Sequence, residues 1–127
     1  MRDFASLGKR KAVLGMIHLQ PLPGTLFYKE DSFKQTLETA VESARALYNG
    51  GADGCLVQTV DRLYSVKDES DPARTTAMGL IVQAIVQATG EEFQVGVQLM
   101  RNALKASLAV AKVAGSHTGQ FLAELLG

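Results

Sequence analysis

The stretch GMIHLQPLPG (residues 15–24) directly follows the apolar run Ala12–Leu14. A short apolar strand therefore leads a single histidine, His18, into a loop that Pro21 and Pro23 stiffen by fixing their backbone angles. The first strand of an α/β barrel presents a site in this way, at its carboxyl end. The stretch thus predicts a buried strand that delivers one polar residue to a loop.

The same layout recurs about every forty residues. Strands are expected near residues 12, 54 and 94, and each precedes a helical pattern. This alternation indicates parallel strands joined by right-handed crossovers. We therefore predict an α/β fold: a partial TIM (β/α)8 barrel with three parallel βα units over 12–115 and a short helical tail over 116–127. A whole barrel needs about 250 residues, and this chain has 127, which we expect to form one domain.

Helix boundaries are marked by capping residues and glycines. Ser32-Phe33-Lys34-Gln35 has the form of a capping box, and Asn49-Gly50-Gly51 supplies a stop. Asp71-Pro72 starts a second helix that Gly90 ends, and Asn102 caps a third. The three apolar faces that we expect to be buried are Phe33, Leu37, Val41, Ala44 and Tyr48; Met78, Ile81, Ile85 and Ala88; and Leu104, Leu108, Ala111 and Val113.

Composition excludes several classes of function. Thirteen basic side chains balance thirteen acidic ones, so no basic surface indicates a nucleic-acid partner. No run approaches the roughly 18 apolar residues of a transmembrane helix, and the first eight residues lack a signal core. We expect a cytoplasmic protein without a transmembrane segment, with organellar import left open. The only cysteine, Cys55, excludes an internal disulfide and fits a small buried hydrophobe better than a nucleophile.

Strand parity provides the strongest argument for a site. Side chains alternate between the two faces of a strand. One face is uniformly apolar and suits helix packing: Val13, Ile17, Cys55, Val57, Val95, Val97 and Leu99. The other face ends, at the carboxyl side of each strand, in His18, Gln58 and Gln98. Because active sites of barrels are built at this rim, the three side chains are expected to converge on a ligand.

Residues of the adjoining loops extend this candidate site, and each has a structural alternative. The second strand is followed by Asp61, and the third by Arg101 and Asn102. All three are within reach of the carboxyl ends of the strands. Arg101 fits a phosphate or carboxylate clamp, although a solvated or salt-bridged arginine is commoner. Asn102 fits a helix cap better than a ligand contact. A catalytic role and a hydrogen-bonded structural role fit His18 equally well. For Gln58 and Gln98, a structural role fits slightly better than the orientation of a ligand.

Standard catalytic signatures are missing from the sequence. It contains no Gly-x-Gly-x-x-Gly, no Gly-Lys-Ser/Thr loop and no His-Glu-x-x-His. A CxxC pair and a Gly-x-Ser-x-Gly elbow are also absent. We therefore predict no metal site and no cofactor, and we leave open whether the chain is an enzyme.

Three ordered blocks resemble the BtpA family, which is predicted to form TIM barrels. Residues 15–24 are similar to its GMIHLxPLPG signature, residues 50–54 to its GGvDG, and residues 95–102 to its GVNVLRN strand and turn. The pattern departs at Gln58-Thr59, where the family commonly has Glu-Asn, and at Gln98, where it has Asn. Full-length relatives are about twice this length, and after Gly115 the expected fourth strand is replaced by an unrelated tail. A truncated or alternatively spliced product is therefore expected.

The resemblance implies a barrel protein whose site binds a small polar or phosphorylated metabolite. His18 would be the acid/base residue, since histidine transfers protons near neutral pH. Gln58, Asp61, Gln98, Arg101 and Asn102 would orient the ligand. Some relatives resemble a thylakoid-associated factor for photosystem I accumulation, so the alternative is a non-catalytic accessory or assembly factor. In that case a partner or a second copy would cover the exposed strand edges.

Overall fold

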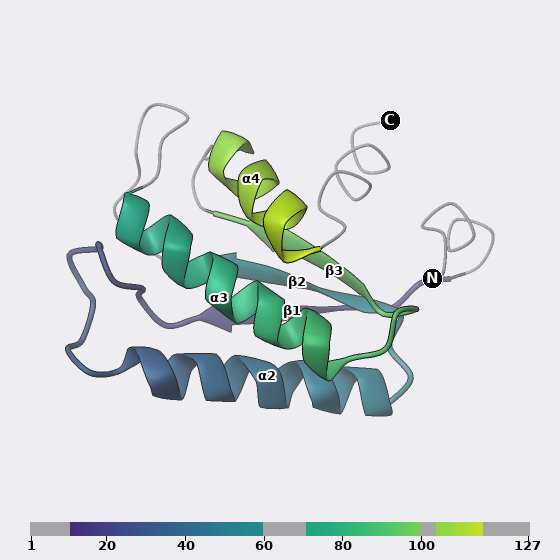
Figure 1. The fold of residues 1–127 in the computed structure, drawn as a ribbon. Coiled ribbons are helices and arrows are strands. Elements are labelled where there is room, and N and C mark those ends of the chain that lie inside the picture. Colours follow the sequence, from purple (N-terminus) through teal and green to yellow (C-terminus); the bar gives the residue numbers. More distant parts are fainter. Residues whose placement is uncertain (1–10, 60–70, 100–103, 116–127) are drawn as a thin grey trace.

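Three strand–helix pairs follow one another along the chain (Figure 1). The computed structural model describes residues 11–59, 71–99 and 104–115; the expected tail over 116–127 lies outside them. The elements are β1 (Leu14–Leu19), α2 (Phe33–Asn49), β2 (Gly54–Thr59), α3 (Pro72–Ala88), β3 (Gln94–Gln98) and α4 (Leu104–Ala114). None of the described helices is long and apolar enough to cross a membrane.

The strands form one parallel sheet in the order β1-β2-β3. Each connection therefore moves one strand in the same direction, and right-handed crossovers that do so place every helix on the same face. Figure 1 shows α2, α3 and α4 together on one side of the sheet. The predicted α/β class with three parallel βα units is confirmed. The open, one-sided sheet is consistent with part of a TIM barrel, in which all helices also lie outside the strands.

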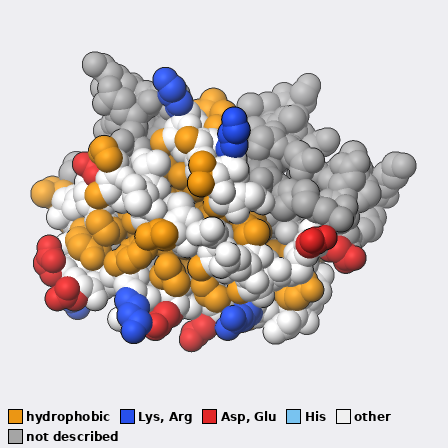
Figure 2. Space-filling view, in the orientation of Figure 1, with side chains coloured by type: hydrophobic (Ala, Val, Ile, Leu, Met, Phe, Trp, Pro, Cys, Tyr) orange, Lys and Arg blue, Asp and Glu red, His pale blue; other side chains and the backbone are white. Residues whose placement is uncertain are grey.

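The core lies between the sheet and the helices. Ile17, Cys55, Val57, Val95 and Val97 are buried on the helix-covered face, as parity predicts. They pack against the buried residues of the central helix: Ala77, Met78, Ile81, Val82 and Ile85. Figure 2, in the same orientation, shows hydrophobic side chains over α3 and its boundary with α2, with charged side chains along the lower edge over α2.

A buried aspartate joins the starts of the strands. Asp53 donates its backbone N–H to the carbonyl of Val13 at 2.8 Å, and its Oδ2 accepts the N–H of Val13 at 2.9 Å. The carbonyl of Asp53 accepts from the N–H of Gln94 at 3.0 Å. Gly51 precedes this contact with φ +90°, a conformation that favours glycine. The Gly-Gly-Ala-Asp-Gly block therefore fixes the strand register.

The proline loop after β1 is held in place by a buried leucine and by hydrogen bonds within the loop. Leu22 is fully buried, and its carbonyl accepts hydrogen bonds from both the N–H and the hydroxyl of Thr25, at 3.2 and 2.7 Å. Gly24 has φ +88°, and a Cβ there would overlap the Asp71 carboxylate. Because Asp71 Oδ1 caps α3 by accepting the N–H of Ala73 at 2.8 Å, the loop after β1 lies against the first turn of α3.

Four expectations about local packing are wrong. Tyr48, expected on the buried face of α2, is 40% exposed. Ser32 occupies the N-cap of α2, but its hydroxyl donates to the Lys29 carbonyl at 2.6 Å and closes a turn, so no capping box forms. Val13 precedes β1 and is 61% exposed. On α4, Leu104, Leu108 and Val113 are exposed, whereas the buried residues are Ser107, Val110, Ala111 and Ala114. Small side chains on this face let α4 pack closely against β3 and α3.

Candidate functional site

Three polar side chains form a row across the carboxyl ends of the strands. His18 pairs in register with Gln58, and Gln58 pairs with Gln98. Paired residues of neighbouring strands lie on the same face of a sheet, about 4.8 Å apart along the row. His18 and Gln98 are exposed and Gln58 is half-buried. The structure therefore brings together the three strand-end residues that parity singles out, on the face that carries none of the described helices. We call this set the polar row.

The first two members of the polar row are hydrogen-bonded. Nε2 of His18 lies 3.2 Å from Oε1 of Gln58. Because a carbonyl oxygen only accepts hydrogen bonds, Nε2 is the donor in this contact, which a neutral imidazole makes in its Nε2–H tautomer. An imidazole in this tautomer accepts a proton through Nδ1, while the glutamine fixes the orientation of its ring. The pair thus supports either proton transfer or ligand positioning.

A buried arginine near the same rim escapes the sequence analysis. Nη2 of Arg74 donates to Oγ1 of Thr59 at 3.0 Å, and the two residues are 6% and 1% exposed. Thr59 ends β2, and Arg74 lies in the first turn of α3. The sequence contains one indication of this burial. Arg74 stands four residues before Met78, so it lies on the same helix face as Met78 and Ile81. The hydrogen bond ties the carboxyl end of β2 to α3.

The loop members of the candidate site cannot be placed. Asp61, Arg101 and Asn102 lie outside the described residues, so their contribution to the site stays a prediction. Within the described part of the chain, no group of three or more His, Cys, Asp or Glu residues has the arrangement to hold a metal ion.

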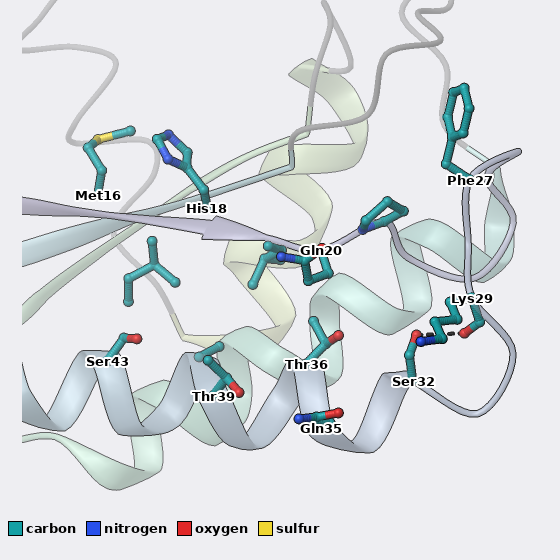
Figure 3. Close-up of a pocket in the computed structure, with 14 residues that line it drawn as sticks. Met16, His18, Gln20, Phe27, Lys29, Ser32, Gln35, Thr36, Thr39 and Ser43 are labelled. Carbon is teal, nitrogen blue, oxygen red and sulfur yellow. Dashed lines mark hydrogen bonds between the residues drawn. The ribbon is translucent and has the colours of Figure 1, made fainter.

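A hollow lies beside the polar row rather than over it. It measures about 640 Å³ and is lined by residues of β1, the loop that follows, and α2. His18 belongs to its lining, but Gln58 and Gln98 do not. Figure 3 shows His18 and Met16 pointing away from α2, whose residues Thr39 and Ser43 form the opposite wall. The hollow and the polar row are therefore two separate features that meet at His18.

Cys55 has no part in either feature. It is fully buried on the helix-covered face of β2, and this burial raises the pKa of its thiol from 9.0 to about 12. A thiol is nucleophilic only as the thiolate. Cys55 is therefore an unreactive core residue.

Comparison with known proteins assigns the chain to a family. The model of the BtpA family matches residues 9–123. The photosystem I biogenesis protein BtpA of Synechocystis is 31% identical over 113 residues, which are 89% of this chain and 38% of that protein. Uncharacterized proteins of Methanocaldococcus jannaschii and Archaeoglobus fulgidus are 29% and 30% identical over 105 and 102 residues, covering 83% and 80% of this chain.

The chain spans about two-fifths of the length of these relatives, 39% for both archaeal proteins. No solved structure matches it. Because the family match covers all of the described residues, including the strand ends that carry the polar row, we conclude that the chain belongs to the BtpA family.

Proposed function

We propose that the polar row is part of a binding site for a small polar or phosphorylated metabolite, with His18 as the residue that exchanges protons with it. The hydrogen bond between His18 and Gln58, in register at the carboxyl ends of β1 and β2, carries this proposal. In parallel α/β sheets, ligands bind at this end of the strands. The row also occupies the face that a closed barrel would turn inward.

Each member of the row has a distinct role in the proposed site. Nδ1 of His18 accepts a proton from the ligand, while Gln58 holds the imidazole in the required tautomer. The amide of Gln98 both donates and accepts hydrogen bonds and orients hydroxyl or phosphoryl oxygens. Asp61, Arg101 and Asn102 complete the proposed site, with the guanidinium of Arg101 as the anion contact.

Titration with inorganic phosphate, followed by NMR, tests this proposal. Phosphate should shift the imidazole resonances of His18 and the side-chain amides of Gln58 and Gln98, and His18→Ala should abolish the saturable part of the response. Gln87, exposed on α3, provides the control, since Gln87→Ala should bind phosphate as the unaltered chain does. His117 is the other of the two histidines of the chain, and equal shifts at His18 and His117 would mean non-specific binding and would refute the site.

A second function is favoured by the open face of the sheet. Met16 is 50% exposed there, with Leu14 and Leu56 half-buried beside it. Exposed apolar surface of this kind marks contacts with other proteins, and a relative of this chain bears the name of a photosystem I biogenesis protein. The alternative function is therefore a non-catalytic assembly factor that acts through this face.

The two functions respond to different substitutions. If the chain acts through protein contacts, Met16→Lys removes partner binding and leaves the phosphate-dependent shifts of Gln58 unchanged. If the chain acts on a metabolite, His18→Ala removes the phosphate response and leaves partner binding unchanged. Co-purification of a defined partner, measured beside the NMR titration for both variants, separates the two.

A further inference from the structure

The outer surface carries an apolar groove between α3 and α4, two helices that lie side by side (Figure 1). The groove measures about 330 Å³. Val113 is 87% exposed and Leu80 is 49% exposed, so both present apolar surface to solvent. The described lining is uncharged and consists of Thr75, Thr76, Gly79, Leu80, Gln83, Ala109, Val110, Val113 and Ala114.

Further strands of the family barrel would not cover this groove. In a TIM barrel the helices form an outer ring around the strands, so added strands extend the sheet on the inner side of the helices. An added helix packs beside α4 and leaves the outward surface between α3 and α4 in solvent. Contiguous exposed apolar surface marks an interaction site. The groove therefore calls for an occupant from outside the barrel wall.

The chain itself leaves the wall of this groove. Val113 and Ala114 are the last two residues of α4, and both belong to the lining. Gly115 follows with φ +77°, and a left-handed residue directly after a helix turns the chain away from the helix axis. The next four residues, 116–119, span up to about 13 Å when extended, which is enough to return the chain over the groove.

Residues 116–127 lie outside the described part of the chain, but their sequence matches the groove. Four apolar residues recur there at the spacing of one helix face: Phe121, Leu122, Leu125 and Leu126. A helix over 120–126 is about 10 Å long, close to the roughly 12 Å that α3 rises along the groove from Thr75 to Gln83. An isolated helix of this length is unstable in water, so it forms only against a surface that buries its apolar face.

We propose that residues 120–126 dock as a short amphipathic helix in the groove between α3 and α4 of the same chain. Their apolar face packs against Leu80 and Val113. Glu124 faces solvent and is the only Asp, Glu, Lys or Arg among residues 116–127. This is the helix-in-groove mode by which proteins bind amphipathic segments. The inference does not depend on the ligand proposed for the polar row.

A nitroxide spin label at residue 123 tests the proposal by NMR. The label is attached through Ala123→Cys in the whole 127-residue chain, where the buried and unreactive Cys55 stays unlabelled. The amide resonances of Thr75–Gln83 on α3 should lose their intensity, because the docked helix holds the label near them. Those of Leu14–Leu19 on β1, which lies two strands from β3, should keep theirs.

Matched substitutions locate the contact on both partners. Leu125→Asp places a charge on the docking face and should restore the resonances of α3, whereas Gln120→Asp, on the polar face of the same helix, should leave the loss of intensity unchanged. Val113→Asp should restore them from the side of the groove. Its control is Leu104→Asp, since Leu104 is also exposed on α4 but does not line the groove.

Three outcomes would overturn the proposal. Unchanged α3 resonances, or equal effects of Leu125→Asp and Gln120→Asp, would show that the segment does not occupy the groove. A greater loss of intensity at Gln94–Gln98 than at Thr75–Gln83 would place the segment beside β3 as a strand. A loss that appears when isotope-labelled chains without the nitroxide are mixed with spin-labelled chains would identify a second copy as its source.

Discussion

Burial of Cys55 makes the free energy of unfolding of this protein depend on pH in the alkaline range. Burial raises the pKa of its thiol to about 12 in the folded state, against 9.0 when exposed. The unfolded chain therefore loses this proton first as the pH rises. The stabilising effect of the neutral thiol is fully present below pH 9 and is lost between pH 9 and about 12. The slope that Cys55 contributes in this window is about 1.4 kcal/mol per pH unit.

Urea unfolding from pH 7 to pH 10.5 measures this slope. Cys55→Ala removes the ionisable group and should flatten the alkaline decline relative to the unaltered chain, although the cavity lowers its stability at neutral pH. Taking the difference between the two proteins cancels the titration of tyrosines and lysines. Identical pH profiles would show that Cys55 is accessible to solvent.

The hydrogen bond between Arg74 and Thr59 stabilises the rim near the site. Thr59→Val keeps the shape of the side chain but removes the Oγ1 that accepts from Nη2 of Arg74. Leaving a buried donor with one acceptor fewer should lower the free energy of unfolding by roughly 1–3 kcal/mol. Chemical denaturation measures the loss, and the exposed Thr76→Val should change stability by under about 0.5 kcal/mol. A neutral Thr59→Val would mean that water replaces the lost acceptor.

The sequence predicts part of the candidate site and misses part of it, for physical reasons. His18, Gln58 and Gln98 are found because strand periodicity and parallel register follow from local patterns. Arg74 is missed because arginine is almost always exposed, and nothing local reveals the Thr59 hydroxyl that accepts its hydrogen bond. The metabolite and the role of His18 depend on side chains from other parts of the site and remain predictions.

At the scale of elements, two glycines should respond to the same substitution with opposite signs. A Cβ on Gly54 would overlap the backbone carbonyl of Gln94 and lie 2.9 Å from its Cβ, whereas a Cβ on Gly79 meets nothing within 4 Å. Gly54→Ala should therefore force β2 and β3 apart and cost at least about 1–3 kcal/mol. Gly79→Ala, inside α3, should stabilise the protein by roughly 0.5–1 kcal/mol. Thermal unfolding of the two variants measures both; a tolerated Gly54→Ala would mean that the register is loose.

Helix ends are predicted well where one residue determines them and poorly where neighbours compete. Asp71 caps α3 as expected because its carboxylate accepts from the N–H of Ala73. The capping box at Ser32 fails because the Lys29 carbonyl takes its hydroxyl. On α4, the buried side of the helix is set by the space against β3 and α3, which favours Ser107 and Ala111 over Leu104 and Leu108. Apolar periodicity alone does not contain that information.

At the scale of the whole molecule, the described helices cover one face of the sheet and leave the other face without a helix. Neighbouring positions of β1 show this difference, since Ile17 is 5% exposed and Met16 is 50% exposed. A closed barrel buries both faces, so the open face marks where the described part of the fold ends. The hollow beside β1 and the apolar patch at Met16 are two consequences of the same open sheet.

Lysine substitution at these two adjacent positions tests this architecture. Ile17→Lys places an uncompensated charge in the core and should abolish cooperative unfolding. Met16→Lys should leave the melting temperature within about 2 °C, because its side chain already reaches solvent, and should reduce the binding of a hydrophobic dye to the open face. Circular dichroism and dye fluorescence provide the two measurements. A marked loss of stability in Met16→Lys would show that another surface covers this face in solution, and the sheet would then be two-sided even without further strands.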